Sequence, residues 1–99
     1  MNTFSELISQ EKLTLVDFSA EWCGPCKMLK PILSELKGKI GESANIIKVD
    51  IDKSPQTAKE YNIRAVPTLI LFKNGNIVWR QTGALPANKL EEVITKYLN

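Results

Sequence analysis

Two strand-like segments separated by one long helical segment constrain the fold of this chain most. Residues 13–18 (Leu-Thr-Leu-Val-Asp-Phe) form a short, mostly apolar run that is typical of a buried strand, and residues 45–50 (Asn-Ile-Ile-Lys-Val-Asp) form a second one. Between them, residues 23–39 carry apolar side chains at helical spacing. Strands that are joined through a helix pair in parallel by a right-handed crossover. The first half of the chain therefore predicts a β-α-β unit.

The second half predicts a hairpin. Residues 68–73 and 76–82 read as strands, and Asn74-Gly75 between them is the strongest short signal for a hairpin turn. A hairpin is antiparallel, whereas the first two strands are parallel. The chain therefore predicts an α/β protein with a mixed four-stranded sheet.

Helices account for the remaining segments and are expected on both faces of the sheet. A short first helix includes Phe4, Leu7 and Ile8, and a second short helix runs from a cap at Ser54 to about residue 61. An amphipathic helix over residues 86–98 closes the chain, and Pro31 is expected to kink the long helix. The side chains expected to face inward from the two longer helices are Met28, Leu29, Ile32, Leu33, Leu36, Leu90, Val93, Ile94, Tyr97 and Leu98.

Length and charge exclude several classes of protein. The 99 residues are expected to form a single domain over 1–99, and 43% hydrophobic residues suffice for a core. A net charge of +2, from 13 basic and 11 acidic residues, is too small to suggest a nucleic-acid partner. No apolar run predicts a membrane span, and the first residues do not resemble a secretory signal. We therefore expect a cytoplasmic protein.

The only two cysteines lie three residues apart, in the segment Trp-Cys-Gly-Pro-Cys-Lys over residues 22–27. This segment falls where the first strand passes into the long helix. Free backbone N–H groups and the dipole at a helix N-terminus stabilise a thiolate. The spacing also brings Cys26 within reach of Cys23, so we predict a redox-active dithiol.

Three other interpretations of the cysteine pair are weaker. A structural disulfide closing a four-residue loop stabilises by about 2 kcal/mol at most. A closed zinc site needs four nitrogen or sulfur ligands, and the chain offers two cysteines and no histidine, so no metal is expected. Two inert buried cysteines do not account for the flanking Trp22, Gly24 and Pro25.

Asp17 interrupts the apolar pattern of the first strand. Burial without a partner raises the pKa of a carboxyl group toward neutrality, where it can exchange protons with a reacting group. Asp17 is therefore a candidate general acid or base, although an aspartate at a solvent-facing strand end would also fit the sequence.

The chain resembles the thioredoxin family at three sites. Residues 16–28 (Val-Asp-Phe-Ser-Ala-Glu-Trp-Cys-Gly-Pro-Cys-Lys-Met) resemble its active-site segment, residues 65–69 (Ala-Val-Pro-Thr-Leu) its second signature and residues 82–84 (Thr-Gly-Ala) its third. The similarity runs from about Phe4 to the C-terminus. The resemblance implies the thioredoxin fold, but without the strand that usually precedes the first helix. Ser19 also departs from a tryptophan common in bacterial members, and Ala65 from a frequent glycine.

The resemblance also implies roles in the chemistry. Cys23 is the expected nucleophile, and Cys26 is the expected resolving thiol and the more buried of the two. Asp17 is expected to exchange a proton with Cys26, directly or through water. Lys48, in the neighbouring strand, is expected near Asp17, where a cation favours the carboxylate; a solvent-facing lysine is the alternative.

A substrate-binding surface follows from the same resemblance. The Val66–Pro67 bond is expected to be cis and to pack against the cysteine pair. The Val66 backbone is then free to pair with an extended peptide. Trp22, Val66, Gly83 and Ala84 are expected to form an apolar collar around Cys23, with Gly24 and Pro25 in the active-site loop.

The expected function is protein disulfide reduction. The resemblance implies disulfide-containing protein substrates, no bound cofactor, and electrons that come from NADPH through a thioredoxin reductase; a monomer is expected. A disulfide oxidant, an isomerase or a glutathione-dependent reductase is a rival, which Gly24-Pro25 and the absence of histidine disfavour. A second rival is a binding module in which the dithiol acts only as a switch.

Overall fold

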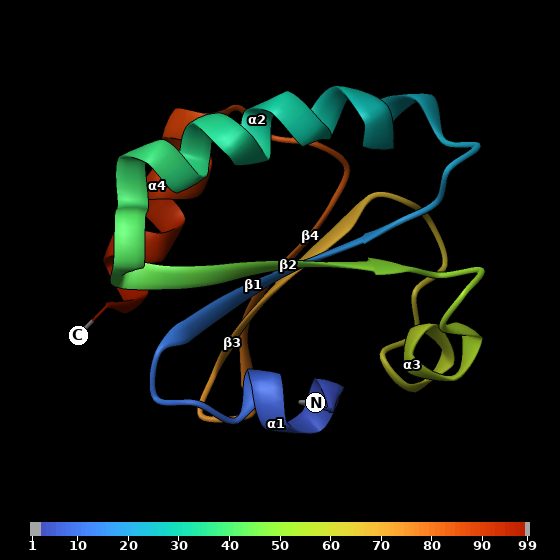
Figure 1. Ribbon diagram of the computed structural model, residues 1–99, viewed down its shortest axis with the longest axis horizontal. Helices are drawn as coiled ribbons and strands as arrows, with labels where there is room; N and C mark the ends of the chain where they lie inside the picture. Colours follow the sequence, from blue (N-terminus) through green and yellow to red (C-terminus); the bar gives the residue numbers. More distant parts are fainter. Residues whose placement is uncertain (1–2, 99) are drawn as a thin grey trace.

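A mixed four-stranded sheet forms the middle layer of the structure, a computed structural model that describes residues 3–98 (Figure 1). The strand order is β2-β1-β3-β4. β1 (Leu13–Ser19) pairs in parallel with β2 (Ala44–Asp50) and antiparallel with β3 (Thr68–Lys73). β3 pairs antiparallel with β4 (Asn76–Thr82). The predicted mixed sheet is confirmed. Within residues 3–98 no strand precedes the first helix, and β2 lies at one edge of the four-stranded sheet.

Helices cover both faces of this sheet. α2 (Gly24–Ile40) and α4 (Ala87–Tyr97) lie on one face, and α1 (Phe4–Ile8) and α3 (Pro55–Glu60) lie on the other (Figure 1). A short 3-10 helix, η1 (Gly41–Ser43), follows α2. Every residue of β1 is buried, as expected for a strand that is covered on both sides.

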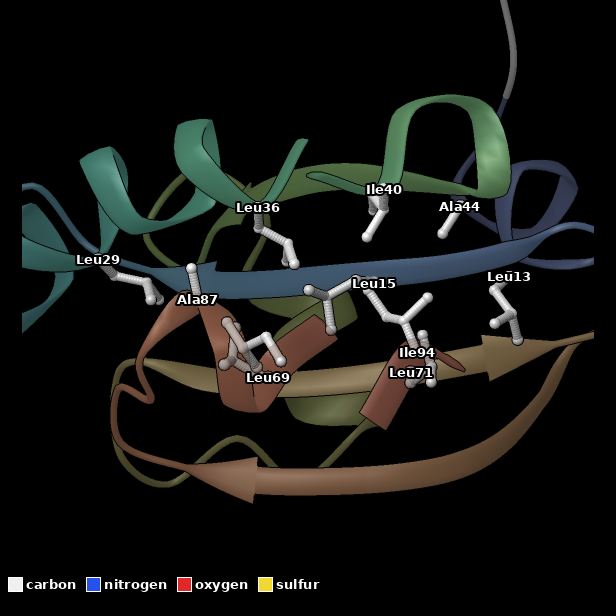
Figure 2. Packing of buried hydrophobic residues seen from close by; sticks show 11 residues of the cluster. Leu13, Leu15, Leu29, Leu36, Ile40, Ala44, Leu69, Leu71, Ala87 and Ile94 are labelled. Carbon is white, nitrogen blue, oxygen red and sulfur yellow. The ribbon is translucent and has the colours of Figure 1, made fainter. Parts of the chain in front are cut away.

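Side chains of β1 and β3 alternate between the two faces of the sheet, and those on one face form the core with α2 and α4. Leu15 of β1 and Leu71 of β3 belong to the same buried cluster as Leu29 and Leu36 of α2 (Figure 2). Ile94 of α4, the other helix on this face, belongs to the same cluster. This cluster holds α2 in place across the sheet.

An aromatic cluster fills the opposite face. Phe4 of α1 packs edge-to-face on Phe72 of β3, and Tyr61, directly after α3, packs on the same ring at a centroid distance of 5.4 Å. Phe18 of β1 lies 6.2 Å from the rings of both Phe4 and Tyr61. Aromatic burial therefore fixes the two short helices, which are too short to be stable alone.

Two inward-facing residues were predicted wrongly. Met28 is 70% exposed, because Cys26, Leu29 and Leu36 define the inner side of α2 and Met28 lies off that stripe. Leu98 is 42% exposed, since it caps α4 after the last helical turn.

The helix ends also differ from the prediction. Ser54 occupies the N-cap of α3, but its side chain donates no capping hydrogen bond and accepts none. The sequence reading missed a capping box at α1, in which the Glu6 N–H donates to Thr3 Oγ1 and the Thr3 N–H donates to the Glu6 carboxylate. α2 continues through Pro31 as one helix. The turn at Asn74-Gly75 has positive φ at both residues, the backbone that the predicted hairpin requires.

The packing of α4 generates a stability prediction. Leu90 is fully buried, so Leu90→Ala is expected to lower the free energy of unfolding by about 2 to 5 kcal/mol through lost burial and a cavity. Leu98→Ala, on the same segment but exposed, is expected to change it by about 0.5 kcal/mol or less. Urea unfolding of both variants measures the difference, and equal losses would contradict the packing described for α4.

Candidate active site

The two cysteines lie at the first turn of α2. Cys23 is the N-cap residue, Gly24 and Pro25 open the helix, and Cys23 and Cys26 form a disulfide with a Cα–Cα distance of 5.2 Å. The Cys26 N–H donates to Cys23 Sγ at 3.2 Å. Both residues are buried in the disulfide form, with Cys23 5% exposed and Cys26 3% exposed. The two cysteines therefore differ little in burial, although Cys26 was expected to be the more buried. A free helical N–H therefore points at the sulfur that is expected to become the thiolate.

Segments from three parts of the chain surround this turn. Ala20, together with the half-buried Ile51 and Val66, packs against the cysteines. Cys23 Sγ lies 3.6 Å from the Val66 carbonyl oxygen, and the Val66–Pro67 bond is cis. The fold therefore brings the segment before β3 directly against the cysteine pair.

The rest of the expected collar lies beside Pro67. The Gly83 N–H donates to the Pro67 carbonyl at 2.8 Å, and Gly83 has a φ of 96°, which favours glycine. Ala84 next to it is exposed. The residue that follows β4 is thus hydrogen-bonded to the residue that precedes β3.

Trp22 is held at the surface by a residue that the sequence reading missed. Trp22 is 69% exposed, and its Nε1–H donates a hydrogen bond to Asp52 Oδ2 at 2.9 Å. Asp52 lies 30 positions away, in the turn after β2, and no local pattern couples it to Trp22. The hydrogen bond fixes an exposed indole beside Cys23, which suits contact with another protein.

Asp17 is buried at 1% exposure, on the face of β1 that α2 covers. Burial raises the pKa of its carboxyl group from 3.8 to about 6, and the Lys48 ammonium opposes this rise. Lys48 stands directly across from Asp17 in the β1–β2 register, and both line a hollow of about 310 Å³ beneath α2. Asp17 Oδ1 has no hydrogen-bond partner within the described chain. A carboxyl group that titrates near neutrality therefore lies under the helix that carries Cys26.

Lys48 itself is an exposed residue of the edge strand β2. Its backbone lies in the sheet edge and its side chain reaches solvent, yet its charge still acts on Asp17. Ser19 is buried at 1% exposure two residues after Asp17, on the same face of β1, and its hydroxyl has no partner in the described chain. The sequence marked Ser19 only as a departure from a family pattern.

Residues 3–98 contain no group of three or more histidine, cysteine or acidic side chains arranged to hold a metal ion. Among the helices described, none is long and apolar enough to cross a membrane.

A cysteine pair at the N-terminus of a helix, beside a cis-proline loop and above a buried carboxyl group, defines the class of thiol-disulfide oxidoreductases. The family model for thioredoxin matches residues 1–96, so the chain belongs to the thioredoxin family.

Comparison with individual relatives supports membership of the same family. The chain is 48% identical over 89 residues to a thioredoxin of Staphylococcus saprophyticus, covering 90% of this chain and 86% of that one. It is 40% identical over 90 residues to a thioredoxin of Bacillus subtilis, with coverages of 91% and 86%. A solved structure of a mutant thioredoxin from Halobacterium salinarum NRC-1 superimposes with a TM-score of 0.86 at 35% identity, covering 96% of this chain and 82% of that chain.

The predicted fold and activity are therefore confirmed. The protein is a thiol-disulfide oxidoreductase that reduces protein disulfides through its Cys23–Cys26 pair. Membership of the family implies disulfide-containing substrates and a reductase as partner, and members work without a bound cofactor.

The raised pKa of Asp17 predicts a pH-dependent stability. Between about pH 4 and pH 6 the folded protein keeps a proton on Asp17 that the unfolded chain releases. The contribution of this proton to the free energy of unfolding is therefore complete below about pH 4 and is lost as the pH rises through about 6. The loss amounts to about 3 kcal/mol, because the pKa rises by about two units. Asp17→Asn is expected to remove this loss and to be more stable than the parent at pH 7.

Urea unfolding of the oxidised protein from pH 4 to pH 7 measures this difference. Glu35→Gln, which removes an exposed carboxylate of α2, is the matched control for the change in net charge. A difference between Asp17→Asn and parent that stays constant over this range would show that Asp17 does not titrate there.

Proposed function

We propose that Cys23 is the nucleophile of this reductase and that Cys26 resolves the mixed disulfide. The observation that carries the assignment is the Cys26 N–H directed at Cys23 Sγ, at a helix N-cap that also bears the helix dipole. The Cys23 thiolate attacks one sulfur of the target disulfide, the target S–S bond breaks, and the departing sulfur takes a proton.

The resolving step completes the transfer of two electrons. The Cys26 thiol gives its proton to the Asp17 carboxylate, directly or through water, and the resulting thiolate attacks Cys23 Sγ. The mixed disulfide breaks, the second target sulfur leaves and is protonated, and a Cys23–Cys26 disulfide remains. At pH 7 a carboxyl group with a pKa of about 6 is mostly ionised, so Asp17 is ready to accept a proton.

The substrate is proposed to lie as an extended segment over the collar. The Val66 backbone pairs with it by strand addition, with Pro67, Gly83 and Ala84 as its flat surroundings and the Trp22 indole as its edge. Gly24 and Pro25 leave the approach to Cys23 open, since a Cβ at Gly24 meets no atom within 4 Å.

The cellular setting is proposed from the same chemistry. Electrons from NADPH reach the Cys23–Cys26 disulfide through a flavoprotein thioredoxin reductase, and the protein acts in electron transfer as a monomeric single domain over 1–99. A reactive dithiol with this task belongs in a reducing compartment, which supports the cytoplasm.

Replacing each cysteine separates the two roles. Cys23→Ser is expected to reduce turnover of a protein disulfide to background, because the nucleophile is lost. Cys26→Ser is expected to accumulate a covalent complex with the target that dithiothreitol releases. Mass spectrometry under non-reducing conditions detects this complex; a complex that forms with Cys23→Ser instead would reverse the assignment.

Replacing Asp17 tests the proton transfer. Asp17→Asn is expected to slow resolution of the mixed disulfide at pH 7 by about tenfold or more, since general acid–base assistance contributes about 10² to 10⁴. Lys48→Gln is expected to raise the pKa of Asp17 further and to shift the break in the pH profile to higher pH, because Lys48 lowers that pKa. Stopped-flow measurement of product release between about pH 5 and pH 9, a range that brackets the pKa of Asp17 at about 6, checks both predictions. A break that Lys48→Gln leaves in place would remove Lys48 from the mechanism.

A further inference from the structure

The outer edge of β2 has no role in the chemistry described above. Within residues 3–98, β2 (green in Figure 1) pairs with β1 alone and ends the strand order. The N–H and C=O of one strand residue point to the same side, and those of the next residue point to the other side. The Ile51 N–H, directly after β2, donates to the Ser19 carbonyl of β1. By this alternation the odd-numbered residues of β2 face β1, whereas the backbone groups of Ile46 and Lys48 point outward.

The open part of this edge is short and is bounded at both ends. The Ala44 carbonyl accepts a hydrogen bond from Lys37 Nζ at 3.1 Å, and the Asp50 carbonyl accepts one from the N-cap residue of α3 at 2.9 Å. Between them, the two N–H and two C=O groups of Ile46 and Lys48 have no partner within residues 3–98. An unpaired stretch of backbone of this kind accepts an added strand.

The side chains along the edge are only half covered. Ile46, Ile47 and Val49 are half-buried, whereas every residue of β1 is buried. A hollow of about 310 Å³ lies on the α2 side of the edge, and a second hollow of about 300 Å³ reaches Leu7 of α1. Ile46 lines both hollows. Because side chains alternate along a strand, an added segment would place side chains on both faces of this edge.

The hollow on the α2 side has a positively charged rim. Lys30, Lys37 and Lys48 line it and are exposed, and the one acid among its lining residues, Asp17, is buried. Within residues 3–98, neither Lys30 nor Lys48 forms an ion pair. Directly opposite residues of neighbouring strands place their side chains on the same face. Acidic side chains opposite Ile46 and Lys48 would therefore meet these lysines.

The same charges disfavour a second copy of this chain at the edge. Two β2 edges that pair antiparallel are related by a two-fold axis perpendicular to the sheet, so both α2 helices lie on one face. Lys30 and Lys48 of both copies would then gather along one seam, where like charges destabilise the pairing. Charge complementarity therefore favours an acidic segment of another protein.

We infer that the outer edge of β2 is a docking site for an extended acidic segment of a partner protein, which adds to the sheet as a fifth, antiparallel strand. Antiparallel pairing satisfies all four outward groups of Ile46 and Lys48 with two partner residues. The acidic side chains of those two residues point toward the lysines on the α2 side, and the residue between them covers Ile47. This site does not involve the cysteines, so the partner segment needs no disulfide.

A peptide titration of the oxidised protein tests the site, because the Cys23–Cys26 disulfide leaves no thiol to react. The probe is a peptide with the core Thr-Glu-Val-Glu-Thr, blocked at both ends, and the readout is the amide NMR spectrum of the protein. We expect saturable shifts centred on Ile46 and Lys48. A peptide with Lys in place of both Glu is expected to bind about tenfold or more weakly at low salt. High salt is expected to reduce this difference, because exposed charges are screened.

N-methylation of the peptide tests the strand pairing itself. In the proposed register the N–H groups of both Glu residues point at β2, and the N–H of the central Val points away. Methylating both Glu amides is expected to weaken binding by about tenfold or more, since two hydrogen bonds are lost. Methylating the Val amide is expected to weaken it by about twofold or less. Equal effects would exclude strand addition, and the reverse order would exclude the antiparallel register.

Charge reversal on α2 locates the recognition. Lys30→Glu, beside the hollow, is expected to weaken binding of the Glu peptide by about fivefold. Lys39→Glu makes the same change in net charge near the other end of α2, away from the hollow, and is expected to have little effect. An equal effect of the two variants would mean that net charge alone attracts the peptide and would overturn the site.

Sedimentation of the protein alone tests the second copy as occupant. We expect a monomer at the concentration of the NMR experiment. A dimer in which the Ile46 and Lys48 amides are protected from hydrogen exchange would assign the edge to a second copy and overturn the inference. Absence of any shift at Ile46 and Lys48 with the Glu peptide at about 1 mM would overturn it as well.

Discussion

The packing of α2 across β1 is the constraint on which the site depends. Leu29 and Leu36 press the helix onto Leu15, and this contact sets where the helix begins relative to the end of the strand. The N-terminus of α2 therefore lies beyond the end of β1, with Cys23 as its cap and both cysteines buried. The same contact places the helix over Asp17. One apolar interface thus determines both the thiol position and the burial of the carboxyl group.

The raised pKa of Asp17 means that its ionisation at neutral pH costs stability. A protein of this size has a free energy of unfolding of about 5 to 15 kcal/mol, so a loss of about 3 kcal/mol on ionisation is a large fraction. Burial raises the pKa and Lys48 opposes it, which leaves the carboxyl group able to exchange protons near neutral pH. An apolar side chain at this position would avoid this cost but would not supply the proton acceptor that we propose for Cys26. Within residues 3–98, Asp17 Oδ1 and the Ser19 hydroxyl lack hydrogen-bond partners, so this face of β1 carries buried polar groups at a cost in stability.

Local patterns predict the elements of this fold well, because the periodicity of each strand and helix is set by its own buried face. They also predict the cysteine turn, since the strand-to-helix junction and the spacing of Cys23 and Cys26 are contiguous in sequence. The errors fall where contacts are not local. Met28 differs from Leu29 only in which side of the helix the sheet happens to cover, and the Trp22–Asp52 hydrogen bond joins residues 30 positions apart.

The two faces of the sheet are coupled through the segment between α3 and β3. The sulfur atoms and Asp17 lie on the side of β1 that α2 covers, whereas the aromatic cluster around Tyr61 fills the opposite face and anchors α3. The segment that follows α3 contacts both sides, because Ile63 packs against the aromatic cluster and Val66 packs against the cysteines. Packing on the face away from the cysteines therefore helps to set where the Val66 carbonyl oxygen lies relative to Cys23 Sγ.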